Sequence, residues 1–149
     1  MTITYEMVRA SFLMKVTSYD FLEMTNEMVQ TQIDKYMKQA ITAFKFVCKY
    51  DLTTTADDAE QRFNVDVDED DVEELVEIIS NGMVVKWLKP YINRQELLEN
   101  VLNTRDFTTY SPSELLYRVG EAYKKAQTDY KQAIREYSYN HGDLSVLHL

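Results

Sequence analysis

The chain has 149 residues, of which 45% are hydrophobic and 28% charged, with a net charge of −9 and one cysteine. This composition predicts a single soluble globular domain and excludes an internal disulfide, while the longest uncharged stretch, residues 78–85, is too short to span a membrane. The acidic balance argues against non-specific binding to nucleic acid, and the first residues carry no signal-peptide pattern, so we expect synthesis in the cytoplasm.

The first third of the chain predicts two amphipathic helices. Apolar residues recur at helical spacing over residues 7–16, and Thr4 or Tyr5 can open this short helix. A second apolar stripe, over residues 28–47, predicts a helix of about 20 residues that buries one face.

A segment without helical periodicity follows. Between residues 50 and 68 the apolar period is lost, and residues 63–67 alternate apolar with polar side chains, so we expect a loop with at most a short edge strand. The next helix, over residues 72–88, is the most apolar of the chain and should be the central one. Gly82 inside it calls for a closely approaching neighbour, and Pro90 should end the helix.

Two further helices are predicted in the second half of the chain. Asn93 and Glu96 form a capping pair before a short helix over residues 97–102. The sequence Ser-Pro-Ser-Glu at residues 111–114 then supplies a helix start. Apolar residues spaced alternately by three and four over residues 116–137 predict a coiled-coil seam on a helix of about 27 residues.

Together these elements predict an all-α fold: a helical bundle of five helices with one long C-terminal helix, a short acidic loop or edge strand, and an extended C-terminal tail. Gly142 breaks the long helix. We place the helical domain at residues 1–139 and the tail at residues 140–149. Because the tail is too short to bury its own apolar side chains, we expect them to serve a partner.

The acidity of the chain is concentrated in one segment. Residues 51–81 hold twelve acidic residues against one basic residue, Arg62, a local charge of −11. Residues 66–77 place acids at the spacing of a calcium-binding loop. However, Asp71 stands where that loop needs glycine, and Glu73 stands where it needs an apolar residue. We therefore expect no metal site, and interpret these acids as the cap, first turn and solvated face of the following helix.

No arrangement of residues predicts catalysis. His141 and His148 lie in or beside the tail, and Asp143 is the one acid near them. A chain end gives such a pair no fixed geometry, and with three glycines there is little room for a phosphate-binding loop. We expect a protein that is not an enzyme and has no cofactor.

Tyrosines are abundant in the last helix. For Tyr123 and Tyr130, packing within the chain and contact with a partner remain equally open. For Tyr137 and Tyr139, beside the tail, we expect a protein interface, where aromatic residues with a polar tip are enriched.

Six segments in succession resemble a group of virion proteins of tailed bacteriophages, the head-tail connector or adaptor proteins of the neck. They follow one another in order between residues 12 and 147, and the resemblance lies in their number and succession rather than in one signature. The segments are residues 12–21 (FLMKVTSYDF), 36–52 (YMKQAITAFKFVCKYDL), 63–67 (FNVDV), 81–90 (NGMVVKWLKP), 103–112 (NTRDFTTYSP) and 137–147 (YSYNHGDLSVL).

The resemblance implies a mostly helical, non-catalytic subunit of the virion. Such subunits form a ring beneath the portal protein and extend the DNA channel toward the tail, so the implied partners are the portal, neighbouring copies and a tail-side neck or tail protein. DNA would pass through the channel without sequence-specific binding. In this family a C-terminal arm commonly docks on the portal, and long helices of neighbouring subunits pack side by side. The resemblance thus gives residues 123–137 a partner.

Two sets of candidate residues follow. The portal or subunit interface would comprise Tyr137, Tyr139, Asn140, His141, Asp143, Leu144, Val146, Leu147 and Leu149. The acidic segment that could face the channel, where negative charge keeps DNA from sticking, would comprise Asp66, Asp68, Glu69, Asp70 and Asp71.

A second hypothesis comes from a different functional class. Residues 51–77 could mimic DNA and make the chain an inhibitor or decoy of a nuclease or polymerase. A mimic usually spreads acids over its surface at phosphate-like spacing, whereas here they cluster in one loop and one helix start. The pattern therefore favours the connector.

Overall fold

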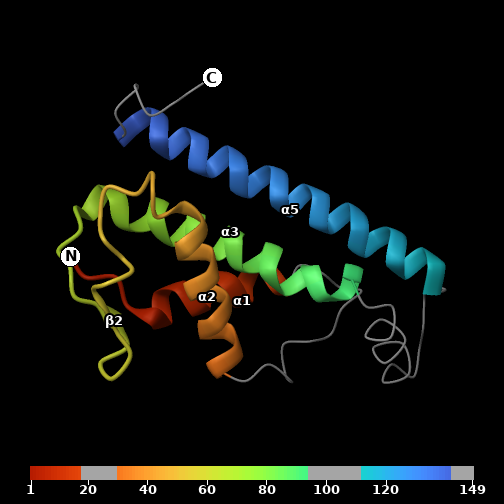
Figure 1. Ribbon diagram of the computed structural model, residues 1–149, viewed down its shortest axis with the longest axis horizontal. Helices are drawn as coiled ribbons and strands as arrows, with labels where there is room; N and C mark the ends of the chain where they lie inside the picture. Colours follow the sequence, from red (N-terminus) through yellow and green to blue (C-terminus); the bar gives the residue numbers. More distant parts are fainter. Residues whose placement is uncertain (18–29, 94–111, 142–149) are drawn as a thin grey trace.

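The structure, a computed structural model of the chain, describes residues 1–17, 30–93 and 112–141 (Figure 1). Within these residues it is built of helices, with one two-stranded hairpin, which confirms the predicted all-α bundle with a long C-terminal helix. The elements in chain order are α1 (Tyr5–Val16), α2 (Gln30–Phe44), β1 (Ala56–Asp57), β2 (Arg62–Phe63), α3 (Glu69–Asn93) and α5 (Pro112–His141).

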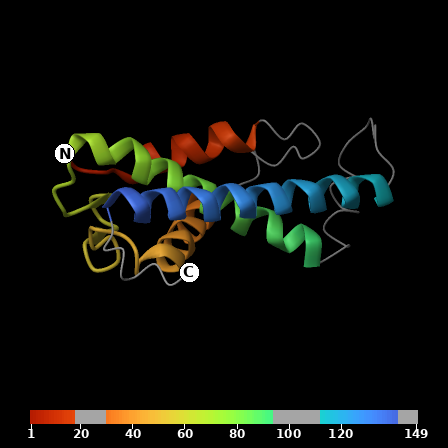
Figure 2. The same cartoon turned by 90° about the horizontal axis from the view of Figure 1, so that it is seen from above.

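Helix α3 is the centre of the bundle, as its apolar sequence predicts. Helices α1, α2 and α5 each pack against it. Figure 2 shows α1 and α2 flanking α3 on either side, while α5 runs along it and covers it. Leu75, Ile79, Met83 and Trp87, spaced by four residues along α3, are almost completely buried. Because α3 is apolar on several faces, it needs all three neighbours to be covered.

Gly82 marks a point where α2, α3 and α5 approach one another closely. A Cβ atom placed on Gly82 would lie 2.8 Å from the Cβ of Ala40 and 2.8 Å from the ring of Tyr130. The hydroxyl of Tyr130 donates a 2.7 Å hydrogen bond to the carbonyl of Ala40, and burial raises its pKa to about 12, so it stays a donor at neutral pH. The expected close neighbour of Gly82 is thus found. Tyr130 packs within its own chain.

The loop after α2 contains a hairpin rather than a lone strand. Strand β1 pairs with β2 in antiparallel register, and Thr4 bridges to Arg62, so the N-terminal segment flanks the hairpin. The prediction of a strand over residues 63–67 is therefore wrong in its bounds. The backbone N–H of Val65 donates to the carbonyl of Phe63 at 2.8 Å, and this tight turn ends the pairing.

Acid should destabilise this hairpin. The side chain of Asn64 and the backbone N–H groups of Glu60 and Ala59 donate to Asp57, and these bonds hold the pKa of its carboxyl below the ordinary 3.8. The pKa of Asp57 is lower in the folded chain than the ordinary 3.8 that it has in the unfolded chain. Its bonds therefore stabilise the fold fully above about pH 3.8, and this stabilisation is lost as the pH falls through the pKa of the folded chain.

We therefore expect the Tm to stay level from neutral pH to about pH 5 and to fall below about pH 4. Asp57→Asn should reduce that fall, as measured by circular dichroism melts across this range. If the Tm of the native chain and that of the Asp57→Asn variant fall equally at low pH, Asp57 does not stabilise the hairpin.

Three helix boundaries differ from the predicted ones. Helix α3 continues through Pro90 to Asn93, because a proline one turn from the end removes only one backbone bond and the buried Tyr91 keeps this turn packed against Trp87. Helix α2 ends at Phe44, where the N–H of Val47 turns back to the Phe44 carbonyl. Helix α5 extends through residues 140 and 141, two residues beyond the predicted start of the tail. The short helix predicted over residues 97–102 lies outside the described residues.

Candidate interaction surfaces

The end of α5 holds the first group of predicted interface residues. Tyr139 is 69% exposed and Asn140 is exposed as well, so both are available to a partner. His141 is the last residue of the helix. The remaining residues of this group, Asp143, Leu144, Val146, Leu147 and Leu149, lie outside the described residues.

Tyr137 belongs to the core, and its assignment to an interface is wrong. Its side chain is fully buried, with its ring in edge contact with Phe44 at a centroid distance of 6.4 Å. Its hydroxyl accepts a 2.9 Å hydrogen bond from the backbone N–H of Lys49, and burial raises its pKa. Tyr137 therefore fixes the C-terminal end of α5 onto the end of α2.

The apolar seam of α5 is also buried within the chain, against α3. Val119, Ala126 and Tyr130 are buried, and α5 packs on α3. Residues 123–137 therefore do not offer this face to a neighbouring copy, which corrects the expectation from the resemblance. The heptad spacing is real, but the apolar face of α3 in the same chain is the surface it meets.

The acidic segment is divided between the surface and the core. The side chains of Asp66 and Asp68 are 94% and 73% exposed, and Glu69 and Asp70 are exposed at the start of α3. Asp71 is only 5% exposed and accepts a 2.8 Å hydrogen bond from the hydroxyl of Tyr50. Asp71 therefore cannot face a channel, because it lies one helical turn before the buried Leu75 and on the same side of α3.

Many of these acids have cationic partners in the chain. Asp66 pairs with the N-terminal amine, Asp68 with Lys49, and Glu77 with Lys15. By contrast, no residue of the described part forms an ion pair with Glu69, Asp70 or Glu73. Three acidic side chains without an ion pair among the described residues thus lie on the first turns of α3.

Calcium should leave the melting temperature unchanged. Among the described residues no three histidine, cysteine or acidic side chains converge as a metal site would require. Asp71 already accepts the bond from Tyr50, and Glu73 is exposed. The measurement is a thermal melt at rising calcium concentration, with magnesium for comparison. A rise in Tm that saturates at micromolar calcium, the range of calcium sensors, would restore the loop as a site.

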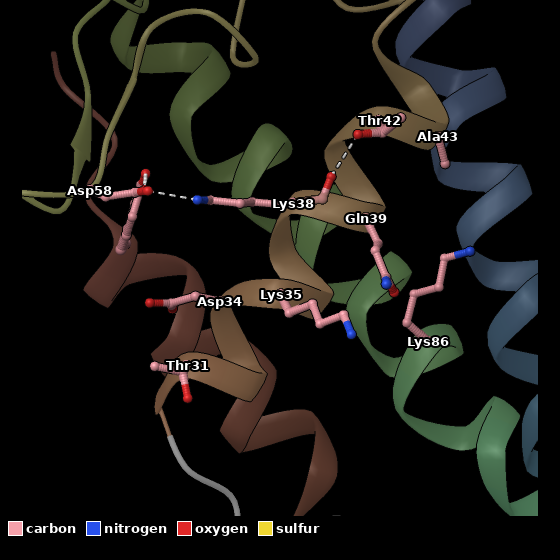
Figure 3. A pocket seen from close by; sticks show the side chains of 10 residues that line it. Thr31, Asp34, Lys35, Lys38, Gln39, Thr42, Ala43, Asp58 and Lys86 are labelled. Carbon is pink, nitrogen blue, oxygen red and sulfur yellow. Dashed lines mark hydrogen bonds and ion pairs between the residues drawn. The ribbon is translucent and has the colours of Figure 1, made fainter.

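A groove that sequence patterns did not indicate opens along α2 (Figure 3). Its volume is about 890 Å³, and side chains from α1, α2, the hairpin and α3 line it. Lys35 and Lys38 come from α2 and Lys86 from α3. Their separation in sequence explains why no pattern predicts the groove; the one signal is the polar face of α2.

The two carboxylates in this groove are compensated. Asp34 accepts two hydrogen bonds from the guanidinium of Arg9, both 2.7 Å long. Asp58 accepts a 2.8 Å bond from Lys38 and a 2.7 Å bond from the hydroxyl of Tyr5. The bond from Lys38, followed by that from Tyr5, lowers the pKa of Asp58, so this carboxylate stays ionised.

Two lysines of the groove have no carboxylate as an ion-pair partner among the described residues. They are Lys35 and Lys86. Figure 3 shows these two side chains gathered with Gln39 on one side of α2, away from the pair of Lys38 and Asp58. The groove therefore carries uncompensated positive charge on a chain whose net charge is −9.

A smaller hollow of about 450 Å³ lies at the end of α2. Phe44, Phe46 and Leu52 contribute apolar surface to it, and Phe46 is 83% exposed, with the amine of Lys45 5.2 Å from its ring centroid. Cys48 also lines this hollow, and burial raises the pKa of its thiol, which therefore remains protonated at neutral pH. This is apolar surface suited to protein contact.

No family model, curated protein or solved structure matches this chain. In the described part of the chain no helix is both long enough and apolar enough to cross a membrane.

Proposed function

We propose that this chain is a structural, non-catalytic subunit of the neck of a tailed bacteriophage. It forms a ring that joins the portal protein to the tail and extends the DNA channel. The six segments that resemble connector proteins support this proposal, as does the helical fold. The observation that carries it is the exposure of two aromatic side chains, Phe46 and Tyr139, near the adjoining ends of α2 and α5, shortly before the apolar tail in the sequence.

Two exposed aromatic side chains lie near one buried contact between α2 and α5. Phe44 and Tyr137 hold the ends of α2 and α5 together, and Phe46 and Tyr139, each two residues further on, are 83% and 69% exposed. Exposed aromatic side chains are enriched at protein interfaces. Four apolar residues follow within the next ten positions of the chain. This end of the molecule therefore supplies the docking surface.

The tail can dock by its main chain and its side chains together. An extended segment that adds to a strand edge gains main-chain hydrogen bonds, and alternate side chains enter pockets of the partner. Full burial of one leucine contributes about 1.5–3 kcal/mol. Several such residues can hold a subunit in place even after the cost of ordering the tail.

The partners and location follow from this assembly. The chain is made in the host cytoplasm and resides in the virion neck, with the portal on one side and a neck or tail protein on the other. Asp66, Asp68 and Asp70 would face the channel, where their charge repels DNA phosphates.

Deleting residues 143–149 should abolish portal binding and leave the fold intact. The tail follows Gly142, which breaks the long helix, and it is too short to bury its own apolar side chains, so we expect the helical content and the Tm to stay nearly unchanged. The assay is a pull-down of the portal protein of the same phage with full-length and truncated chains, run beside thermal melts.

Two matched variants sharpen this test. Replacing Leu144, Val146, Leu147 and Leu149 by serine keeps the length of the tail and removes its apolar side chains; it should abolish binding as the deletion does. Tyr117→Ser alters a 68% exposed residue near the start of α5 and should bind normally. Equal portal binding by full-length and truncated chains would refute the docking role, and a collapsed melt would show that the tail is part of the core.

A further inference from the structure

We propose that the groove along α2 binds the acidic first turns of α3 from a second copy of the chain, with Glu69 and Glu73 of that copy facing Lys35 and Lys86. This inference rests on the ring assembly proposed above and assigns the contact between neighbouring copies.

The groove supplies an unsatisfied positive site. Its own carboxylates, Asp34 and Asp58, are engaged by Arg9, Lys38 and Tyr5. Lys35 and Lys86 remain in it without a carboxylate partner, so anionic groups that enter the groove are attracted by two uncompensated cations. The amide of Gln39, gathered with both lysines in Figure 3, adds a hydrogen-bond donor to the same place.

The first turns of α3 supply the matching negative surface. Glu69 and Glu73 are exposed, are spaced by four residues on one side of the helix, and lack an ion pair among the described residues. Asp70 beside them is exposed and likewise uncompensated. Two carboxylates one turn apart can meet two lysines that project from facing helices.

Charge favours a second copy over DNA as the occupant. A DNA backbone would bring many phosphates to a chain of net charge −9 and to a groove that also contains two carboxylates. A neighbouring copy brings a few carboxylates on a rigid helix. In a ring, each copy is also held close to the next, which raises the effective concentration of a weak contact.

The positions of the two surfaces suit a ring. The start of α3 lies at the end of the molecule that carries the N-terminus, whereas the groove opens along α2 (Figures 2 and 3). One copy can therefore offer each surface to a different neighbour. Such head-to-tail contacts close into rings when the rotation between copies allows it.

The test is self-association of the full chain by sedimentation velocity and mass photometry. We expect assemblies at about 0.1 M salt that dissociate at about 1 M, because the screening length falls from about 10 Å to about 3 Å. The groove variant Lys35→Glu/Lys86→Glu and the helix variant Glu69→Lys/Glu73→Lys should each associate at least about tenfold more weakly.

Mixing the two variants provides the decisive measurement. The groove variant carries negative charge on both surfaces, and the helix variant carries positive charge on both. Equal amounts of the two should therefore restore association in alternating order. No other site of contact predicts that two defective chains repair each other.

Two matched variants accompany these measurements. Lys125→Glu/Lys131→Glu makes the same charge change at exposed positions of α5 and should associate as the native chain does. Because Lys86 is half-buried, Lys35→Glu/Gln39→Glu changes two exposed residues one turn apart on α2 and should reproduce the groove defect without loss of the fold.

Several results would overturn the inference. These are a native chain that stays monomeric at low salt, groove variants that associate normally, or a mixture that does not recover. Binding of a double-stranded DNA oligonucleotide that is lost in the groove variant, with association unchanged, would assign the groove to DNA instead. None of these results alters the portal pull-down, so a failure here is distinct from a failure of the connector proposal.

Discussion

Gly82→Ala should destabilise the chain by about 2 kcal/mol, although alanine favours a helix over glycine by about 1 kcal/mol. The new methyl group would lie 2.8 Å from the Cβ of Ala40 and 2.8 Å from the ring of Tyr130. Neither can withdraw easily, because Ala40 is fixed by its backbone and Tyr130 is held by its hydrogen bond to the Ala40 carbonyl. The helices must separate, which costs packing along their contact.

Gly120→Ala is the matched variant. Gly120 also lies in a helix, and a Cβ atom there would meet nothing within 4 Å. The helix preference alone then acts, so this change should stabilise the chain by up to about 1 kcal/mol. Chemical denaturation of both variants measures whether each change raises or lowers the free energy of unfolding. A stabilised Gly82→Ala chain would show that the three helices do not meet there.

Gly82 also shows which features of the packing the sequence can predict and which it cannot. A glycine inside the most apolar helix costs stability unless a neighbour comes close, so the sequence predicts a contact at this position. It does not name the neighbours, because Ala40 and Tyr130 lie 42 residues before and 48 residues after it. Helical periodicity depends on nearby residues, whereas the choice of partner depends on the whole core.

The same distinction explains the errors in the candidate sites. The heptad spacing on α5 predicts which residues form its apolar face, but it does not predict what covers that face. Helix α3 of the same chain and a helix of another chain could both do so. Asp71 lies in an acidic run whose pattern is typical of a solvated face, whereas in the fold it is buried and accepts a hydrogen bond from Tyr50, 21 residues earlier. Four separate segments, α1, α2, the hairpin and α3, come together to line the lysine groove, so no local sequence pattern predicts it.

Substitutions at Tyr137 and Tyr139 distinguish a core residue from a proposed interface residue. They lie two residues apart on α5, one fully buried and the other 69% exposed. Tyr137→Ala should destabilise the chain by about 3–5 kcal/mol, because it leaves a cavity against Phe44 at the joined ends of α2 and α5. Tyr137→Phe should cost about 1 kcal/mol, because the N–H of Lys49 loses its acceptor while the ring contact survives.

Tyr139→Ala should change the free energy of unfolding by no more than about 0.5 kcal/mol, because an exposed side chain loses little when it is removed. The same variant should weaken capture of the portal protein, since Tyr139 lies on the proposed docking surface. Thermal or chemical denaturation of the three variants gives the stability series, and the pull-down gives binding at a temperature where each chain is folded. If Tyr139→Ala binds the portal as the native chain does, the docking surface excludes the end of α5 and is confined to the tail beyond it. If Tyr137→Ala leaves the melt unchanged, α5 is not anchored on α2 at this end, and the aromatic surface that carries the connector proposal is not built as described.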